Sequence, residues 1–333
     1  MPSRGLRASA LTASATLAVL CLCVALWAHG GSPKRPPVGG TARPSSRPPG
    51  HLVGGDSAAA PPPRGTVPRR PAVSQDLAVR DLNRVLARAH GRVALAAVDL
   101  TSGATVVRGG IRQKFVTASL AKVDILTALL LEHQDRRTRP GPAERALAAE
   151  MIESSDNAAA DALYRAAGGS VGVNAENRRL GLSGTTAHDS HWGLTTTTAT
   201  DQLRLLRQVF TGRSELSRAS RDYLQSLMSR VEGDQSWGVS SAADRNRFAL
   251  KNGWLPRPGN QQWVINSEGQ VWRGGRTLLI VVLSEGNRTQ SQGIALVQSI
   301  ATAAAEALDP APDPVHPATV REDDPPPKSV MRR

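Results

Sequence analysis

The segment from Ala118 to Arg136 is the most apolar helix that this sequence predicts, and it constrains the fold more than any other feature. Its apolar residues lie on most of its faces: Val123, Ile125, Leu126, Leu129, Leu130 and Leu131. A helix of this kind is stable in water only when other elements surround it. The chain must therefore build a folded unit around this segment, with the helix near its centre.

Composition limits that unit to the middle of the 333 residues. Eleven of the 23 prolines fall between Gly31 and Gln75, which predicts an extended, disordered Pro- and Arg-rich linker over residues 31–75. Residues 309–333 are again proline-rich with mixed charge and predict a disordered tail. We therefore expect the folded domain over residues 76–308, a length sufficient to bury a sizeable core.

The first 30 residues read as an export segment. Arg4 and Arg7 precede the uncharged apolar run Ala10–Ala28. This order is typical of a secretory signal, and the run is also long enough to span a bilayer. We expect residues 1–30 to be a signal peptide or an N-terminal membrane anchor, and the protein to be extracellular or at the cell surface. The basic linker then predicts contact with the cell envelope rather than with nucleic acid.

The cysteines exclude several kinds of chemistry. Both of them, Cys21 and Cys23, lie in the N-terminal apolar run. The folded domain therefore has no thiol for a disulfide framework, a nucleophile or a Cys-ligated zinc. Histidine is sparse at seven residues. We expect neither a metal nor a cofactor, and chemistry that depends on Ser, Lys, Asp or Glu.

The predicted elements follow the order helix, two strands, several helices, three strands, helix. The strands cover residues 93–100, 104–107, 248–254, 262–266 and 277–284. The helices cover residues 76–89, 118–136, 143–153, 157–167, 198–210, 215–231 and 291–308. This order predicts an α/β (α+β) fold, in which an antiparallel sheet built from both ends of the domain is flanked by helices and an all-helical lobe is inserted between them.

The sequence Ser119-Leu120-Ala121-Lys122 opens the central helix. Residues three apart share one helical face, so the Ser119 hydroxyl can meet the Lys122 amine. A serine hydroxyl is a weak nucleophile and needs a neighbouring base. Lysine serves as that base if burial or a second cation lowers its pKa. In isolation the same four residues more often form a helix cap followed by an exposed lysine.

Two further motifs follow. Ser155-Asp156-Asn157 lies between two predicted helices, where each of the three residue types is also an ordinary N-cap. Lys251-Asn252-Gly253 lies on a predicted strand, where it is also consistent with a strand that ends at a turn. Neither motif indicates a function by itself.

Together and in this order, the three motifs resemble the S-x-x-K, S-D-N and K-T-G set of class A β-lactamases and penicillin-binding proteins. The resemblance extends over about residues 93–308. It implies a serine β-lactamase/transpeptidase-like fold and an acyl-enzyme at Ser119. It also implies a small β-lactam or a peptidoglycan peptide as substrate, and we expect a monomer.

The resemblance also implies residue roles. Lys122 would take the hydroxyl proton of Ser119, and Ser155 would relay a proton to the leaving nitrogen. The Ser119 and Trp254 backbone N–H groups would form the oxyanion hole. The remaining substrate-binding residues would be Asn157, Lys251, Asn252 and Gly253.

The chain departs from the family pattern in the third motif and in a later loop. Asn252 replaces the usual threonine, and Gly193 follows Trp192 where class A enzymes carry the glutamate that activates water. Without that base, acylation can proceed while hydrolysis is slow. The loop residues His188, Asp189 and His191 are either substitute bases or ordinary surface residues.

Three functions remain open from the sequence. The first is an exported class A-like serine hydrolase that hydrolyses β-lactams after acylation at Ser119. The second is a D-Ala-D-Ala peptidase or penicillin-binding protein with slow deacylation. The third is a non-catalytic cell-wall-binding module that retains the pocket.

Overall fold

The computed structural model describes residues 73–110, 112–257, 259 and 261–309. The predicted export segment (1–30), the predicted linker up to residue 72 and the predicted tail from residue 310 lie outside these ranges. Within them, no helix has both the length and the apolar composition needed to cross a membrane. The fold below therefore concerns the predicted folded domain.

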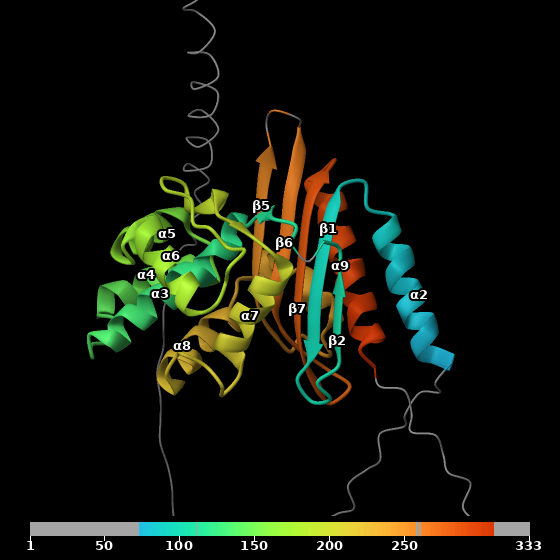
Figure 1. The fold of residues 1–333 in the computed structure, drawn as a ribbon, viewed down its shortest axis with the longest axis horizontal. Helices are drawn as coiled ribbons and strands as arrows, with labels where there is room; N and C mark the ends of the chain where they lie inside the picture. Colours follow the sequence, from blue (N-terminus) through green and yellow to red (C-terminus); the bar gives the residue numbers. More distant parts are fainter. Residues whose placement is uncertain (1–72, 111, 258, 260, 310–333) are drawn as a thin grey trace, which may run out of the picture. The chain divides into compact units, whose positions relative to one another are not determined.

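A five-stranded antiparallel sheet forms the centre of the domain (Figure 1). Its strand order is β2-β1-β7-β6-β5. The early strands are β1 (Arg92–Asp99) and β2 (Thr105–Arg108), and the late ones are β5 (Phe248–Arg257), β6 (Gln262–Arg273) and β7 (Arg276–Asn287). Because β1 pairs with β7, the sheet joins the two ends of the domain, which confirms the predicted fold.

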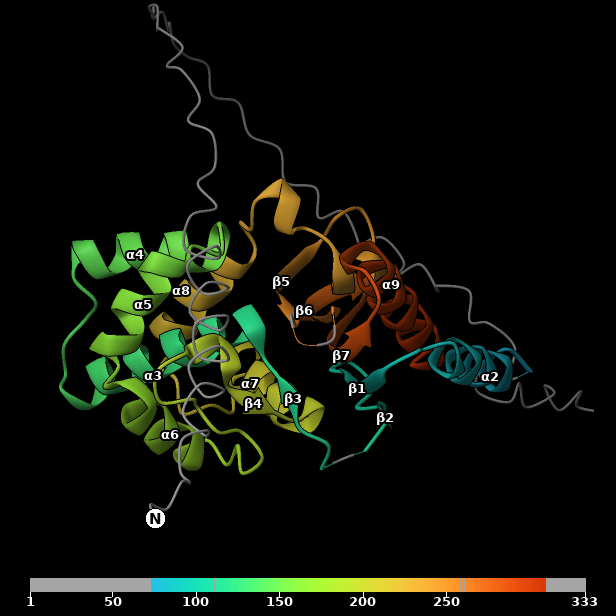
Figure 2. The same cartoon turned by 90° about the horizontal axis from the view of Figure 1, so that it is seen from above.

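One face of the sheet, called the back face here, is covered by two helices. These are α2 (Val73–Ala87) and α9 (Gln290–Ala307), which lie side by side on the same side of the sheet (Figures 1 and 2). The core between them and the sheet is aliphatic and includes Leu95, Leu250, Ile265, Ile280, Val282, Val297 and Ile300. Full burial of each such side chain contributes about 1.5–3 kcal/mol.

The opposite face, called the front face here, carries the other helices. Helix α7 (Ala199–Phe210) packs against β1, β6 and β7. Beside it lies a helical lobe (Figure 2), formed by α3 (Ala121–Asp135), α4 (Pro142–Glu153), α5 (Asn157–Ala166), α6 (Gly169–Arg179) and α8 (Arg218–Met228). A two-stranded sheet of β3 (Phe115–Val116) and β4 (Thr196–Thr197) lies next to the lobe.

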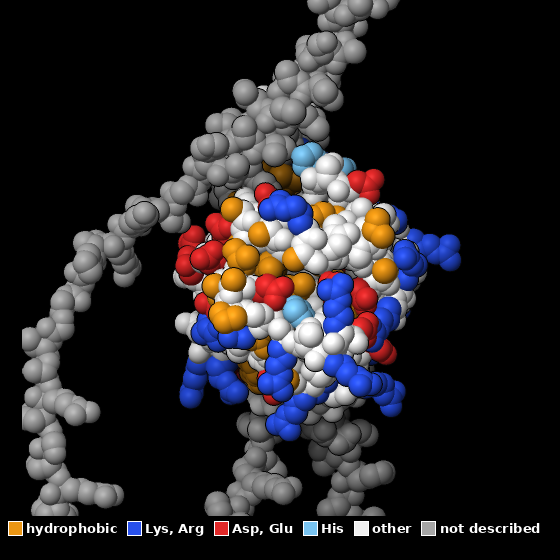
Figure 3. Space-filling view, turned by 90° about the vertical axis from the view of Figure 1, so that its left-hand side faces the viewer, with side chains coloured by type: hydrophobic (Ala, Val, Ile, Leu, Met, Phe, Trp, Pro, Cys, Tyr) orange, Lys and Arg blue, Asp and Glu red, His pale blue; other side chains and the backbone are white. Residues whose placement is uncertain are grey.

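Helix α3 is the buried centre that the sequence predicts. All residues from Ala121 to Leu131 are buried, and a short 3₁₀ turn, η1 (Ala118–Leu120), precedes the helix. The outer surface of the lobe differs sharply, because basic and acidic side chains are interspersed on it (Figure 3). Ion pairs such as Arg179–Asp135 and Arg230–Glu153 link its helices.

Three features of the fold differ from the sequence prediction, one of which is the β3–β4 sheet, whose two-residue strands are too short to show a pattern. Helix α6 was not predicted, because it begins at two glycines, Gly168 and Gly169, that both have positive φ and that suggest a chain break. The three late strands are also longer than expected, at 10 to 12 residues each. They continue through Pro256 and Gly269, because an edge strand tolerates proline and because Gly269 lies so close to Ala249 that a Cβ atom would be 2.3 Å from its carbonyl oxygen.

Candidate active site

Ser119 lies in the η1 turn immediately before helix α3. The preceding residue, Ala118, has a φ of 48°, a left-handed conformation that costs a non-glycine residue about 1–3 kcal/mol. Ser119 is 4% exposed, and its hydroxyl forms no hydrogen bond with any described residue. The nucleophile candidate is thus held by a strained turn, with its hydroxyl uncommitted.

Lys122 is fully buried one helical turn after Ser119. Its Nζ lies 2.6 Å from the backbone oxygen of Ser155, 3.0 Å from the Ser155 Oγ and 2.9 Å from the Oδ1 of Asn157. The sequence predicts a contact between this amine and Ser119. In the structure the amine hydrogen-bonds the second motif instead. Catalytic hydrogen bonds often tighten only in the complex with substrate.

Ser155 joins the three motifs. Its φ of 57° places its carbonyl and its hydroxyl on the same amine, Lys122. The Nζ of Lys251, from strand β5, donates to the same Ser155 Oγ at 2.9 Å. One hydroxyl therefore lies between two buried amines, and the structure brings Lys122, Ser155, Asn157 and Lys251 together.

Burial lowers the pKa of both lysines. Desolvation lowers the pKa of Lys122 well below its ordinary value, and the positive charge of Lys251 lowers it further, against the opposing effect of Asp156 and Asp161. Desolvation also lowers the pKa of Lys251, to about 7, although Glu268 and Asp234 oppose this shift. A lysine that is neutral near neutral pH can accept a proton, which an ordinary lysine cannot.

Trp192 forms one wall beside Lys122. Its ring centroid is 4.8 Å from the Lys122 Nζ, and its Nε1 donates to the Oδ1 of Asp161 at 2.6 Å. The indole is buried, so it excludes water from one side of the amine. This contributes to the desolvation that lowers the lysine pKa.

Gly253 lies directly against the η1 turn. A Cβ atom at this position would be 2.6 Å from the Thr117 oxygen and 2.9 Å from the Ser119 nitrogen, so only glycine fits. Strand β5 is the edge strand of the sheet, and an edge strand has backbone groups available to pair with an added chain. Trp254, the next residue, packs against Trp237 with ring centroids 6.0 Å apart.

Asn252 faces away from these residues. Its Nδ2 donates to the backbone oxygens of Gln235 and Trp237, at 2.7 and 3.0 Å. Successive residues of a strand point to opposite faces, so Asn252 lies on the back face and Lys251 on the front face. Contact between Asn252 and a substrate carboxylate would require both of these hydrogen bonds to break.

The loop before Gly193 holds its titratable side chains in local contacts. The Nδ1 of His188 accepts from the backbone N–H groups of Ser190 and His191, at 3.3 and 3.2 Å. The Oδ1 of Asp189 accepts from the Ser170 hydroxyl at 2.7 Å. These contacts stabilise the turn and favour a structural role for His188 and Asp189 over that of a water-activating base.

Two buried carboxyl groups near the site were not identified from the sequence. Glu268 is directly opposite Lys251 in the β5–β6 register, and Asp124 is two residues after Lys122 in helix α3. Neither carboxyl has a hydrogen-bond partner among the described residues. Desolvation, with a contribution from Asp124, raises the pKa of Glu268 well above its ordinary value. An aspartate inside the most apolar helix was the signal available in the sequence.

The arrangement suits acyl transfer. It combines an uncommitted hydroxyl, a buried amine whose pKa is lowered, a second hydroxyl between two amines and a glycine that lets a substrate chain approach the nucleophile. Among the described residues, no group of three or more His, Cys, Asp or Glu side chains is placed to hold a metal ion.

A family model described as "Beta-lactamase enzyme family" matches residues 142–308, half of the chain. The match includes the second and third motifs and starts after the first. In sequence, the chain is 28% identical over 230 residues to the "Putative lipoprotein LppW" of Mycobacterium tuberculosis. That alignment covers 65% of this chain and 73% of the relative.

Solved structures share the fold. A beta-lactamase from Chitinophaga pinensis has a TM-score of 0.61 at 20% identity, over 69% of this chain and 99% of its own. The protein PBP-A has a TM-score of 0.60 at 23% identity, over 73% and 98% of the two chains. A mutant of PBP-A, solved as an acyl-enzyme complex with penicillin G, has a TM-score of 0.60 at 22% identity, over 72% and 98%.

Proposed function

The chain belongs to the beta-lactamase enzyme family, and from this premise we propose that it is an exported serine hydrolase whose Ser119 is acylated by β-lactams or related amides. In the proposed reaction, the Ser119 Oγ attacks the amide carbonyl and Lys122 takes the hydroxyl proton. The C–N bond then breaks, and Ser155 passes a proton to the leaving nitrogen while Lys122 reprotonates Ser155. The products are an ester at Ser119 and a neutral amine, whose new N–H hydrogen comes in net terms from the Ser119 hydroxyl, and Lys122 is again an uncharged amine.

Binding groups complete the proposed mechanism. The backbone N–H groups of Ser119 and Trp254 stabilise the negative charge on the carbonyl oxygen, an effect worth about 3–4 kcal/mol per donor in other enzymes. Lys251, when protonated, attracts the substrate carboxylate. Asn157 holds the substrate amide.

The observation that carries the proposal is the position of the Ser155 hydroxyl. Two buried lysines, Lys122 and Lys251, lie within 3.0 Å of it. Two amines on one hydroxyl cost stability, because each loses hydration and the two repel when both are charged. Such an arrangement is expected where proton transfer matters and not where a fold needs only packing.

Mass spectrometry of the full chain after exposure to benzylpenicillin tests the proposal. Because ring opening releases no fragment, the expected product is heavier by the whole mass of penicillin. The Ser119→Ala variant should give no adduct, and Ser226→Ala, at a serine of helix α8 outside the site, should react like the native chain. Equal labelling of the native chain and Ser119→Ala would overturn it, as would a native chain that gives neither an adduct nor hydrolysed penicillin.

Gly193 favours a second candidate, a D-Ala-D-Ala peptidase with slow deacylation. No carboxylate is present at Gly193. The His188 side chain already binds within its loop, and the Asp189 side chain binds Ser170 of helix α6. The lifetime of the penicillin adduct separates the two candidates. Loss within seconds favours a β-lactamase, whereas persistence for hours together with release of D-alanine from a peptide favours the peptidase.

We also place the protein at the cell envelope. The basic start before the apolar run Ala10–Ala28 and the similarity to a relative named as a lipoprotein support this location. Fractionation of cells that express the full chain tests it. The protein should be found with membranes or in the medium, and recovery in the cytoplasmic fraction alone would contradict it.

A further inference from the structure

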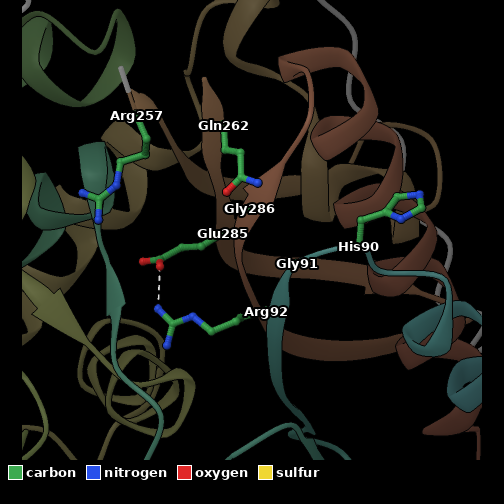
Figure 4. Close-up of a pocket in the computed structure, with 7 residues that line it drawn as sticks. All are labelled: His90, Gly91, Arg92, Arg257, Gln262, Glu285 and Gly286. Carbon is green, nitrogen blue, oxygen red and sulfur yellow. Dashed lines mark hydrogen bonds and ion pairs between the residues drawn. The ribbon is translucent and has the colours of Figure 1, made fainter. Parts of the chain in front are cut away.

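A pocket of about 290 Å³ opens at the end of the five-stranded sheet (Figure 4). It lies where strands β5 and β7 end and strands β1 and β6 begin. Its lining residues are His90, Gly91, Arg92, Arg257, Gln262, Glu285 and Gly286. The proposed reaction uses none of these residues.

The pocket lies on the same face of the sheet as the proposed active site. Arg257 follows Lys251 by six residues on β5, and an even spacing places both side chains on the front face. Arg92 pairs with Glu285 in the β1–β7 register. The Oε1 of Glu285 accepts from the backbone N–H of Val116 at 2.6 Å, and Val116 is three residues before Ser119. The pocket and the nucleophile therefore share one short connecting segment.

Among the residues that the structure describes, one positive charge of the pocket has no counter-charge. The Oε2 of Glu285 accepts from Arg92 at 2.5 Å, so this carboxylate neutralises one guanidinium. Arg257, which is partly buried, forms no hydrogen bond or ion pair with a described residue. Its planar guanidinium is suited to a carboxylate, which it can bind through two parallel hydrogen bonds.

The edge strand β5 carries both Arg257 and Trp254, the residue of the proposed oxyanion hole. A substrate carbonyl in the proposed oxyanion hole lies at Trp254, and Arg257 is three residues, or about 10 Å, further along the strand. Lys251 lies in the opposite direction and would hold the leaving-group side. A peptide added to the β5 edge would therefore extend its acyl side toward Arg257.

We infer that Arg257 and its pocket form an acyl-side subsite that selects peptides bearing a carboxylate two to three residues before the carbonyl that acylates Ser119. The inference rests on the proposed function, and it names the substrate class as an acidic peptide. A charge-assisted hydrogen bond contributes about 1.5–3 kcal/mol, so the acid should bind at least about tenfold more tightly than its uncharged amide.

Binding to the Ser119→Ala variant tests the subsite without any need for catalysis. The probes are the peptides N-acetyl-Ala-Glu-Ala-D-Ala-D-Ala and its Gln counterpart, and the readout is the ratio of their dissociation constants by calorimetry. We expect a ratio of at least about ten with Arg257 present and a ratio near one after Arg257→Gln. The matched control is Arg247→Gln, which removes an exposed arginine just before the other end of β5 and should keep the full ratio.

The outcomes separate the two proposals. Equal affinity for acid and amide, no binding of either peptide, or a preference that survives Arg257→Gln would overturn the subsite. Penicillin labelling of a chain with native Ser119 and Arg257→Gln is read in parallel. If that adduct forms normally while the peptide preference is absent, the subsite is wrong and the serine hydrolase stands. If the native chain itself gives neither an adduct nor hydrolysed penicillin while the preference is present, the serine hydrolase proposal is wrong and the binding preference stands.

Discussion

Leu250 and Lys251 are neighbours on strand β5, and their side chains leave the sheet on opposite faces. Leu250 enters an aliphatic core beneath helix α9. Lys251 enters a buried region of the front face that also contains Lys122, Glu268 and Asp124. Both side chains are 0% exposed, so the two faces differ in the chemistry of what they bury and not in how completely they bury it.

The free-energy consequences of the two faces have opposite signs. Burial of aliphatic side chains on the back face stabilises the fold. Burial of amines and carboxyl groups on the front face costs stability, because each group loses hydration and the carboxyl oxygens of Glu268 and Asp124 have no hydrogen-bond partner among the described residues. We infer that the back face supplies the stability and that the front face uses part of it to hold reactive groups in shifted protonation states.

Lys122→Met has the largest expected effect and separates reactivity from stability, because it should slow acylation strongly and change the free energy of unfolding little. Loss of the proposed base should lower the rate of penicillin acylation by about 10²–10⁴-fold. The free energy of unfolding should change by less than about 2 kcal/mol, because the hydrogen bonds lost with the buried amine are offset by the removal of its desolvation cost. Stopped-flow acylation and urea unfolding measure the two effects.

The control for that variant is Lys114→Met, which removes an exposed lysine ahead of strand β3 and should leave acylation unchanged. A native acylation rate in Lys122→Met would contradict the role of Lys122. A decrease of much more than about 2 kcal/mol in the free energy of unfolding would show that Lys122 stabilises the fold. That result would contradict the proposal that the buried front-face groups cost stability.

Asp124→Asn tests the cost of a buried carboxyl through its pH dependence. Desolvation raises the pKa of Asp124 to about 7, so the folded state binds a proton that the unfolded state releases above about pH 4. The contribution of Asp124 to the free energy of unfolding of the native chain therefore falls as the pH rises from about 4 to about 7. The stability of Asp124→Asn relative to native should increase by on the order of 4 kcal/mol between about pH 4 and pH 8.

Urea unfolding at several pH values gives this difference directly. The comparison variant is Asp222→Asn, at a carboxylate whose side chain is 63% exposed, and its stability relative to native should be nearly independent of pH. Parallel pH curves for the native chain and Asp124→Asn would show that Asp124 is not a buried neutral acid.

The back-face elements could be predicted from the sequence because local signals agree with the tertiary structure. Apolar residues at helical spacing predicted helix α2 near its observed bounds, and alternating β-rich runs predicted the pairing strands. The Thr289 side chain caps helix α9, two residues before the start at residue 291 that the sequence predicts. Helix α6 was not predicted because glycine marks the end of a helix more often than its start.

The front-face site could be predicted only in part. The order of the three motifs identified the residues that meet, including Lys122, Ser155 and Lys251. The position of Glu268 opposite Lys251 depends on the register of two strands, which short-range patterns do not contain. The contacts of Lys122 with Ser155 and Asn157 depend on the left-handed backbone at Ser155, a conformation that serine rarely adopts.

Leu250→Ala is the counterpart on the back face and has the smallest expected effect. Removal of a fully buried leucine should lower the free energy of unfolding by about 3 kcal/mol, through lost burial and the cavity that remains. Acylation at Ser119 should stay within about twofold of native in conditions where the variant is folded, because Leu250 points away from the front face. The exposed Leu77, replaced by alanine, should change stability by less than about 0.5 kcal/mol. If Leu250→Ala slowed acylation as strongly as Lys122→Met, the two faces would be coupled through strand β5, and the division of stability and reactivity between them would be wrong.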